Sequence, residues 1–139
     1  MKISDLINNR DFKIYFYNGT NSIINNIVCS DLHSYALNKL NNNDIWITVI
    51  AHMNTLAVAK LKNIACIILA DGIKPPQDIL KAAQEHKITI FLSRYPVYET
   101  AITVNNIIFH LWRLFLLFGL LFPGRFCLFL LFWLSIPTS

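Results

Sequence analysis

The stretch "DIWITVIAHMNTLAVAKLKNIACIILADG", residues 44–72, decides the fold class. It opens with β-branched and aromatic residues at 44–50 that carry no charge after Asp44, and it closes with a second apolar run at 64–70. Runs of this kind are typical of strands that are buried on both faces of a parallel sheet. Residues 53–63, between them, have the apolar spacing of a helix. The stretch therefore predicts two parallel strands joined by a crossover helix.

The same alternation continues on both sides of this stretch. Further strands are predicted at 25–30 and 88–93, and further helices at 31–40, 77–87 and 95–107. A short helix at 3–11 precedes an alternating strand at 12–17, which suits an antiparallel position at the sheet edge. Alternating strands and helices favour an α/β fold, with a mostly parallel sheet of about four or five strands and helices on both faces.

Charge and cysteine content exclude several classes of protein. The net charge is only +4, and the lysines are scattered along the chain, so no basic patch for nucleic acid is predicted. The three cysteines lack the paired spacing of a zinc site, and Cys29 and Cys66 fall within predicted strands, where we expect buried thiols. No apolar signal segment opens the chain. These features predict reduced thiols and a cytoplasmic location.

The motifs of common enzyme classes do not occur in the sequence. It has no P-loop, no G-x-G-x-x-G, no H-E-x-x-H and no G-x-S-x-G, and its four histidines lack metal-ligand spacing. A Cys29, His52 and Asp31 arrangement for nucleophilic catalysis is conceivable, but Cys29 is expected to point into the sheet. We therefore expect no enzymatic activity, no cofactor and no metal.

Polar side chains follow each predicted parallel strand, at the point where the strand ends. Ligands of open parallel sheets bind outside this carboxyl edge, where helix N-termini supply N–H groups. The candidate ligand-binding residues at this edge are Asp31, Ser34, Thr48, His52, Asn54, Asp71 and Arg94. Arg94 suits a carboxylate or a phosphate, so the predicted ligand is small and anionic.

Each of these candidates also has a purely structural interpretation. Asp31 and Asn54 are good helix caps, Asp71 with Gly72 is a common turn dipeptide, and Arg94 is compatible with a solvated loop. His52 suits a turn residue hydrogen-bonded to the backbone. A cap at Asn54 would not need His52, which makes His52 the first candidate for mutation.

Several pieces of the chain occur in the order and spacing of a known family. An Asp-Leu-x-Ser helix start lies at 31–34, a Trp-Ile-Thr strand at 46–48, and a His-x-Asn helix start at 52–54. An Ala-Val-Ala core follows at 57–59, and an aromatic-Glu-x-Ala helix lies at 98–101. Over residues 1–104 the chain resembles the DRTGG domain.

This resemblance implies an α/β domain similar to the N-terminal domain of HPr kinase/phosphorylase. Such domains occur as stand-alone bacterial proteins, or fused to CBS pairs or to phosphate acetyltransferase, with a regulatory or ligand-sensing role. The Asp-Arg-Thr-Gly-Gly string itself does not occur in this sequence, and its role in other members is not carried over. Kinase activity is not expected either, because the kinase P-loop is missing.

The last part of the chain, residues 105–139, has a different composition from the rest. It is rich in Leu and Phe, and no acidic residue follows Glu99. One interpretation is a membrane segment within 109–136, although its two apolar halves are each short of a full span. A single span would place Arg125 deep in the bilayer, at a cost of roughly 2.5–3.5 kcal/mol. A non-native tail from a shifted reading frame and a partner-binding segment are the alternatives.

Two functional hypotheses follow from these observations. The first is a non-enzymatic regulatory module that senses a small anionic ligand at the carboxyl edge of the sheet. The second is a protein–protein interaction module that regulates a partner enzyme and is tethered to a membrane by its tail. A homodimer is compatible with either hypothesis.

Overall fold

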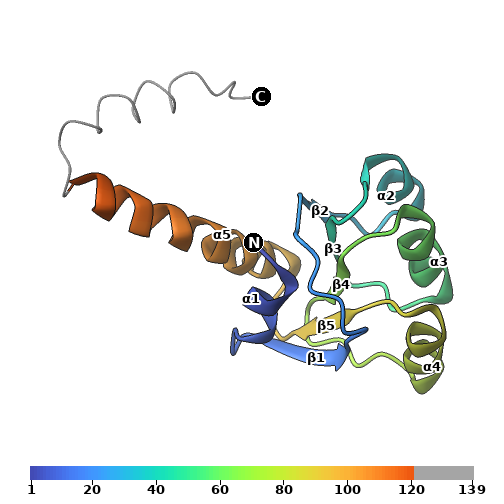
Figure 1. Cartoon of the computed structure of the whole chain (residues 1–139). Helices are drawn as coiled ribbons and strands as arrows, with labels where there is room; N and C mark the ends of the chain where they lie inside the picture. The colour runs from blue at the N-terminus through green and yellow to red at the C-terminus, as the bar shows by residue number, and fades with distance from the viewer. Residues whose placement is uncertain (121–139) are drawn as a thin grey trace. The chain divides into compact units, whose positions relative to one another are not determined.

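The structure, a computed structural model, describes residues 1–120, and at 109–115 and 117–120 it describes the backbone alone. Figure 1 shows the arrangement of its helices and strands. Residues Met1–Asn105 form a compact unit that contains the whole sheet. The elements are α1 (Ile3–Ile7), β1 (Phe12–Phe16), β2 (Ile27–Cys29), α2 (His33–Lys39), β3 (Ile45–Thr48), α3 (Met53–Lys62), β4 (Cys66–Leu69), α4 (Gln77–His86), β5 (Ile90–Ser93) and α5 (Val97–Leu120).

The strands form one sheet in the order β1-β5-β4-β3-β2. Strands β2 to β5 are parallel to their neighbours, and β1 pairs with β5 in the antiparallel direction. The α/β fold predicted from the sequence is therefore confirmed, with a mostly parallel sheet of 5 strands. The antiparallel edge position of the first strand is confirmed as well.

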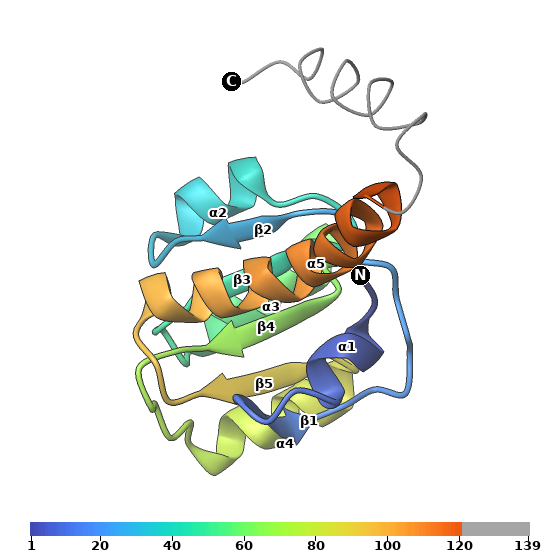
Figure 2. The same ribbon diagram turned by 90° about the vertical axis from the view of Figure 1, so that its left-hand side faces the viewer.

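The helices cover both faces of the sheet, as the sequence predicts. Strands β2 to β5 follow one another across the sheet, so right-handed crossovers place α2, α3 and α4 on the same face. Helix α1 and the first turns of α5 lie on the opposite face (Figures 1 and 2). The helix after β4 therefore lies on one face of the sheet and the helix after β5 on the other. In many α/β proteins such a divergence marks the ligand-binding edge.

Alternating side chains of the central strands build a core on each face. Val28, Trp46, Ile67 and Ile90 lie in register across four strands and pack in one cluster with buried residues of α3 and α4. Every residue of β3 and of β4 is buried. This agrees with their uncharged sequences, because a strand covered on both faces leaves no position for a solvated side chain.

The first and last helices have different lengths from those predicted. Helix α1 ends at Ile7 rather than near residue 11, because the Asn9 side chain instead accepts a hydrogen bond from the Asp11 backbone N–H at 2.8 Å. Helix α5 continues to Leu120, well beyond the predicted end at 107. Leucine is a good helix former and no proline occurs between Pro96 and Pro123, so no local signal ends the helix earlier.

The predictions for the tail concern residues that lie largely outside the described chain. Residues 121–139, with the Pro123-Gly124-Arg125 break, are not described. Within residues 1–120, no helix combines the length and the apolar character that crossing a membrane requires.

Candidate functional site

The carboxyl edge of the sheet positions the candidate residues in the order of the strands. Asp31 follows β2, Thr48 ends β3, Asp71 follows β4 and Arg94 follows β5. Neighbouring strands are about 4.8 Å apart, so Asp31 and Arg94 are separated by roughly 14 Å along this edge. The candidates therefore share one edge of the sheet, but they do not converge on one point.

Asp31 and Thr48 form a hydrogen-bonded pair that joins the ends of β2 and β3. The Thr48 hydroxyl donates to Asp31 Oδ1 at 2.8 Å, and the Val49 backbone N–H donates to the same oxygen at 2.9 Å. Thr48 is buried, and its hydroxyl also accepts from the Ile50 N–H at 3.2 Å. Asp31 therefore holds two loops together. Its alternative role as a helix cap is wrong, since Leu32 is the N-cap residue of α2.

His52, rather than Asn54, is the residue that caps α3. Its ring Nδ1 accepts a hydrogen bond from the Asn54 backbone N–H at 3.1 Å, and His52 is the N-cap residue of the helix. The sequence interpretation that a cap would not need His52 is wrong. An accepting Nδ1 places the hydrogen of the neutral ring on Nε2. The Asn54 side chain is thereby left free of the capping role that was expected of it.

Replacement of His52 by alanine should lower the free energy of unfolding by about 1 kcal/mol, because the first turn of α3 loses its side-chain acceptor. Urea denaturation followed by circular dichroism measures this change. The matched variant His52→Asn supplies a different acceptor at the same position and should retain most of the stability. Equal unfolding midpoints for His52→Ala and the unmodified chain would show that the cap contributes nothing.

His33 and Thr55 form a second polar contact at this edge, which was not among the predicted site residues. The Thr55 hydroxyl donates to the Ile50 carbonyl oxygen at 2.9 Å, and His33 Nε2 lies 2.9 Å from the same hydroxyl. Since the hydroxyl hydrogen is used, Nε2 of His33 is the donor. The ring also packs edge-on against Trp46, with centroids 6.0 Å apart. No local motif connects His33 to Thr55, so this pair could not be predicted from the sequence.

Arg94 belongs to a separate group at the other end of the edge. Its Nη2 donates to the Tyr95 hydroxyl at 2.7 Å, and its guanidinium lies 4.9 Å from the centre of the Tyr95 ring. The Tyr95 hydroxyl in turn donates to Asp11 Oδ1 at 3.3 Å. The interactions with Tyr95, and more weakly with Asp11, raise the pKa of Arg94 above its ordinary value. Asp11 comes here because Phe12 pairs with Ser93.

Asp71 lies in a turn that joins the loops after β4 and β5 through backbone hydrogen bonds. Asp71 and Gly72 both have positive φ angles, 63° and 65°. The Asp71 N–H donates to the Tyr95 carbonyl oxygen at 2.7 Å, and the Gly72 N–H donates to the Ser93 carbonyl oxygen at 3.0 Å. Backbone atoms thus fill the place where the chain diverges to the two faces, and the exposed Asp71 side chain lies outside it.

The cysteine at this edge does not have the properties of a nucleophile. Cys29 is exposed, contrary to the predicted buried position, because it lies on the edge strand β2 on the sheet face opposite α2. Partial burial and the nearby Asp31 carboxylate raise the pKa of its thiol. Cys66 is buried, as expected, and burial raises the pKa of its thiol strongly. Neither thiol is therefore activated as a thiolate at neutral pH.

A protein-family model, the DRTGG domain, matches residues 14–107. The chain belongs to the DRTGG domain family. The resemblance inferred from the sequence is thus confirmed, although the family's name-giving Asp-Arg-Thr-Gly-Gly string does not occur in this member. A search of the curated proteins finds no match.

A solved structure contains a similarly folded region. It is the crystal structure of the CBS and DRTGG domains of the regulatory region of Clostridium perfringens pyrophosphatase, complexed with the activator diadenosine tetraphosphate. The sequences are 12% identical and the TM-score is 0.57. The match covers 71% of this chain but only 44% of the other, so the present chain spans less than half of that regulatory region.

In this DRTGG domain the predicted site residues form separate groups. Asp31 and Thr48 are in direct contact, His52 and Asn54 share the start of α3, and Arg94 stands with Tyr95 and Asp11. Ser34 is exposed on α2 and Asp71 is exposed in its turn. Among the described residues, no group of three or more His, Cys, Asp or Glu side chains could hold a metal ion.

Proposed function

We propose that this chain is a non-enzymatic regulatory module that binds a small anionic ligand at the carboxyl edge of its sheet. Membership of the DRTGG family supports a regulatory role. A similarly folded region lies in a regulatory segment that was solved with a nucleotide activator, diadenosine tetraphosphate. The ligand class proposed here is therefore a phosphate-bearing metabolite, with nucleotides as the first to test.

The observation that carries this proposal is the state of Arg94. Its guanidinium is exposed and permanently charged, and it packs against the Tyr95 ring. Among the described residues, the guanidinium donates one hydrogen bond, to Tyr95. Its other N–H donors are therefore available to a ligand from solvent. A planar, preorganised fork of this kind is suited to bidentate binding of phosphate or carboxylate oxygens.

The start of α5 adds a second favourable feature beside Arg94. This helix begins at Val97, close after Arg94, so its first N–H groups lie at the same edge of the sheet. The partial positive charge of a helix N-terminus favours an anion by about 0.3–1 kcal/mol near the surface. Asp11 bears a negative charge nearby, but its Oδ1 already accepts from Tyr95. A ligand that reaches Arg94 and the α5 start from outside would avoid that carboxylate.

Binding is better supported than catalysis at this edge. The hydroxyl of Thr48 and the N-cap ring of His52 are held in hydrogen bonds that stabilise loops. The raised pKa of Cys29 keeps its thiol protonated. The Thr55 hydroxyl lies beside His33 Nε2, but it donates to the Ile50 carbonyl oxygen, so this ring nitrogen is not placed to take its proton as a catalytic base would.

A thermal-shift series on the full chain tests this proposal. The panel contains diadenosine tetraphosphate, mononucleotides, acyl phosphates and sugar nucleotides. A ligand at about 100 times its Kd adds roughly 2.7 kcal/mol of stability, which raises the melting temperature by several degrees. Arg94→Ala should remove most of this shift while the melting temperature without ligand stays nearly the same.

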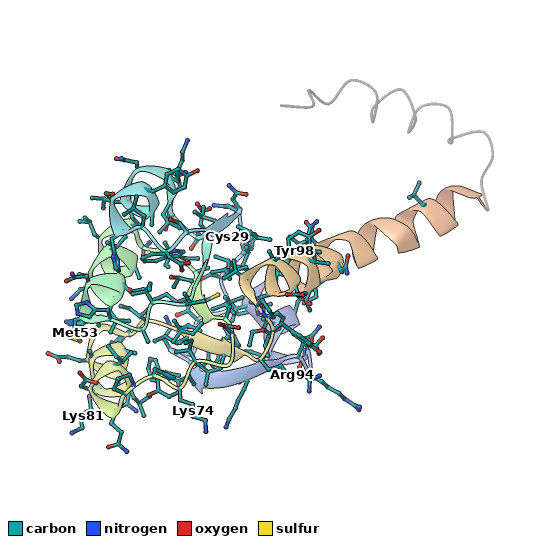
Figure 3. All side chains as sticks on the ribbon, turned by 180° about the vertical axis from the view of Figure 1, so that it is seen from behind. Cys29, Met53, Lys74, Lys81, Arg94 and Tyr98 are labelled. Atoms are coloured by element: carbon teal, nitrogen blue, oxygen red, sulfur yellow. The ribbon has the colours of Figure 1, made fainter. Side chains whose placement is uncertain are left out.

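Lys81→Ala is the matched control for Arg94→Ala. It removes one positive charge from the outer side of α4, on the other side of the molecule from Arg94 (Figure 3). The ligand-induced shift should survive this change. No shift with any panel member, or equal shifts in the Arg94→Ala variant, would count decisively against the proposal.

The second candidate function is an interaction module that regulates a partner enzyme without a ligand of its own. The exposed apolar side chains of Met53 and Leu61 on α3 favour this alternative. A pull-down of a purified candidate enzyme with the full chain separates the two functions, because only the first requires Arg94. Homodimerisation and membrane attachment through residues 109–136 stay predictions, to be tested by sedimentation and by a carbonate wash of membranes.

A further inference from the structure

Helix α3 exposes apolar side chains on its outer side, next to the polar residues Asn54 and Lys60. Leu56 and Ala59 are buried against the sheet, as a core helix requires. Met53 and Leu61, on the outer side, are 45% and 73% exposed, and Ala57 between them is exposed too. Apolar side chains that are exposed together on one surface often mark a site of interaction with a partner. The neighbouring helix α4 shows the ordinary pattern, with polar and charged residues at its exposed positions.

The exposed residues of α3 line a groove with the end of α4. Met53, Ala57 and Leu61 are spaced every fourth residue and therefore form one stripe along the helix. Together with Leu56 and His86 they line a surface cavity of about 540 Å³. Figure 3 shows Met53 at the outer surface of the helix layer, on the far side from Arg94. This apolar groove is thus separate from the carboxyl-edge residues described above, apart from the Asn54 side chain at its end.

Lys60 is the one charged residue among those that line this groove. Lys60 Nζ lies 3.0 Å from His86 Nδ1, across the gap between α3 and α4. The ammonium group has no acceptor role, so the lysine donates and the ring nitrogen accepts. No acidic residue lines the groove, and α3 contains none. A partner that presents carboxylates beside an apolar strip would match both the charge and the apolar stripe.

The shape of the groove distinguishes a helix from a small molecule as the occupant. A site for a small molecule encloses most of its ligand, whereas Leu61, at 73% exposure, stands at an open rim. The stripe from Met53 to Leu61 runs for roughly 12 Å along the helix axis. A second helix with apolar residues at positions i, i+4 and i+7 packs along such a stripe, and methionine adapts to its side chains.

We propose that the groove between α3 and α4 docks an acidic amphipathic helix of a partner protein. The apolar face of that helix would pack on Met53, Ala57 and Leu61, and its flanking carboxylates would pair with Lys60. This inference goes beyond ligand binding at the carboxyl edge and does not depend on it. The two proposals fail separately, because Arg94→Ala tests the first and leaves the groove unchanged.

Fluorescence anisotropy with the full chain tests this docking. The probe is a designed, labelled helical peptide of about 18 residues, long enough to form a helix, with leucines on one face and glutamates beside them. A matched probe carries lysines in place of the glutamates. The acidic peptide should bind and the basic peptide should bind at least about tenfold more weakly, a difference of about 1.4 kcal/mol.

Variants of the chain locate the contact. Leu61→Glu should weaken binding of the acidic peptide by about tenfold or more. Lys60→Glu should shift the binding preference toward the basic peptide. Leu32→Glu is the matched control, because Leu32 is also highly exposed, at 64%, but does not line the groove. Both positions are on the surface, so circular dichroism should show an unchanged fold in every variant.

Four results would overturn the proposal. They are no binding of the acidic peptide, equal binding of both peptides, equal losses in Leu61→Glu and Leu32→Glu, and no loss in Leu61→Glu. A further experiment uses phosphatidylglycerol vesicles in place of the peptides. Binding of the chain to these vesicles that is lost in Leu61→Glu, without peptide binding, would assign the groove to a membrane surface instead.

Discussion

Replacement of Trp46 by alanine should lower the free energy of unfolding by about 3–5 kcal/mol. Trp46 is 0% exposed in strand β3, which lies between β4 and the edge strand β2, and its side chain belongs to the core cluster beneath α2 and α3. Its Nε1–H donates to the Ser30 carbonyl oxygen at 2.8 Å, and His33 packs edge-on against its ring. The alanine variant therefore loses a large buried ring, a hydrogen bond and an aromatic contact together.

Guanidinium denaturation followed by far-UV circular dichroism measures this loss. Tryptophan fluorescence is not used, because the substitution removes a fluorophore. Trp46→Phe keeps a buried ring but removes the indole N–H, and it should cost clearly less than the alanine variant. Tyr98→Ala is the surface control, because Tyr98 is 74% exposed, and it should change stability by no more than about 0.5 kcal/mol. A loss below about 1 kcal/mol in Trp46→Ala would contradict the described core.

The second large effect is expected at the pair that joins β2 to β3. Thr48→Val keeps the shape of a buried side chain but removes its hydroxyl, and with it the bonds to Asp31 Oδ1 and from the Ile50 N–H. The Ile50 N–H is partly buried, and leaving such a backbone donor without its acceptor costs about 1–3 kcal/mol. We expect a loss of about 2 kcal/mol in the free energy of unfolding, measured by urea denaturation.

A double-mutant cycle attributes this loss to the contact with Asp31. Asp31→Ala removes the acceptor of the Thr48 hydroxyl, and the two single losses should exceed the loss in the double variant by about 0.5–3 kcal/mol. Ser34→Ala is a suitable control for the cycle, because Ser34 is exposed on the next helix. Strictly additive losses for Thr48→Val and Asp31→Ala would mean that the two side chains do not stabilise each other.

The fold could be predicted from the sequence because the composition of each core strand shows whether its two faces are buried. The uncharged runs at 44–50 and 64–70 allow no solvated face, and the helical spacing between them requires a crossover on the sheet. The extent of α5 could not be predicted, because a run rich in Leu and Phe is compatible with a helix and equally with other kinds of apolar segment. The end of α1 was missed because the Asn9 side chain competes for the backbone.

The site could be predicted only as an edge, not as a set of contacts. Strand ends reveal which polar residues share the carboxyl edge, and Asp31 and Thr48 meet because their strands are neighbours. Asp11 enters the Arg94 group through an antiparallel pairing that no local pattern specifies. The cap on α3 was assigned to Asn54 because asparagine is a common cap, whereas here a histidine ring nitrogen accepts that N–H.

Hydrogen–deuterium exchange of the full chain tests the central proposal, an anion site at the carboxyl edge, most directly. The chain is compared with and without the panel ligand that raises its melting temperature most. Slower exchange is predicted in peptides that cover residues 93–98, beside Arg94, and it should disappear in Arg94→Ala. Slowing confined to the opposite edge of the sheet, around Asn43 and Asn63, or no slowing with any ligand, would contradict the proposed site.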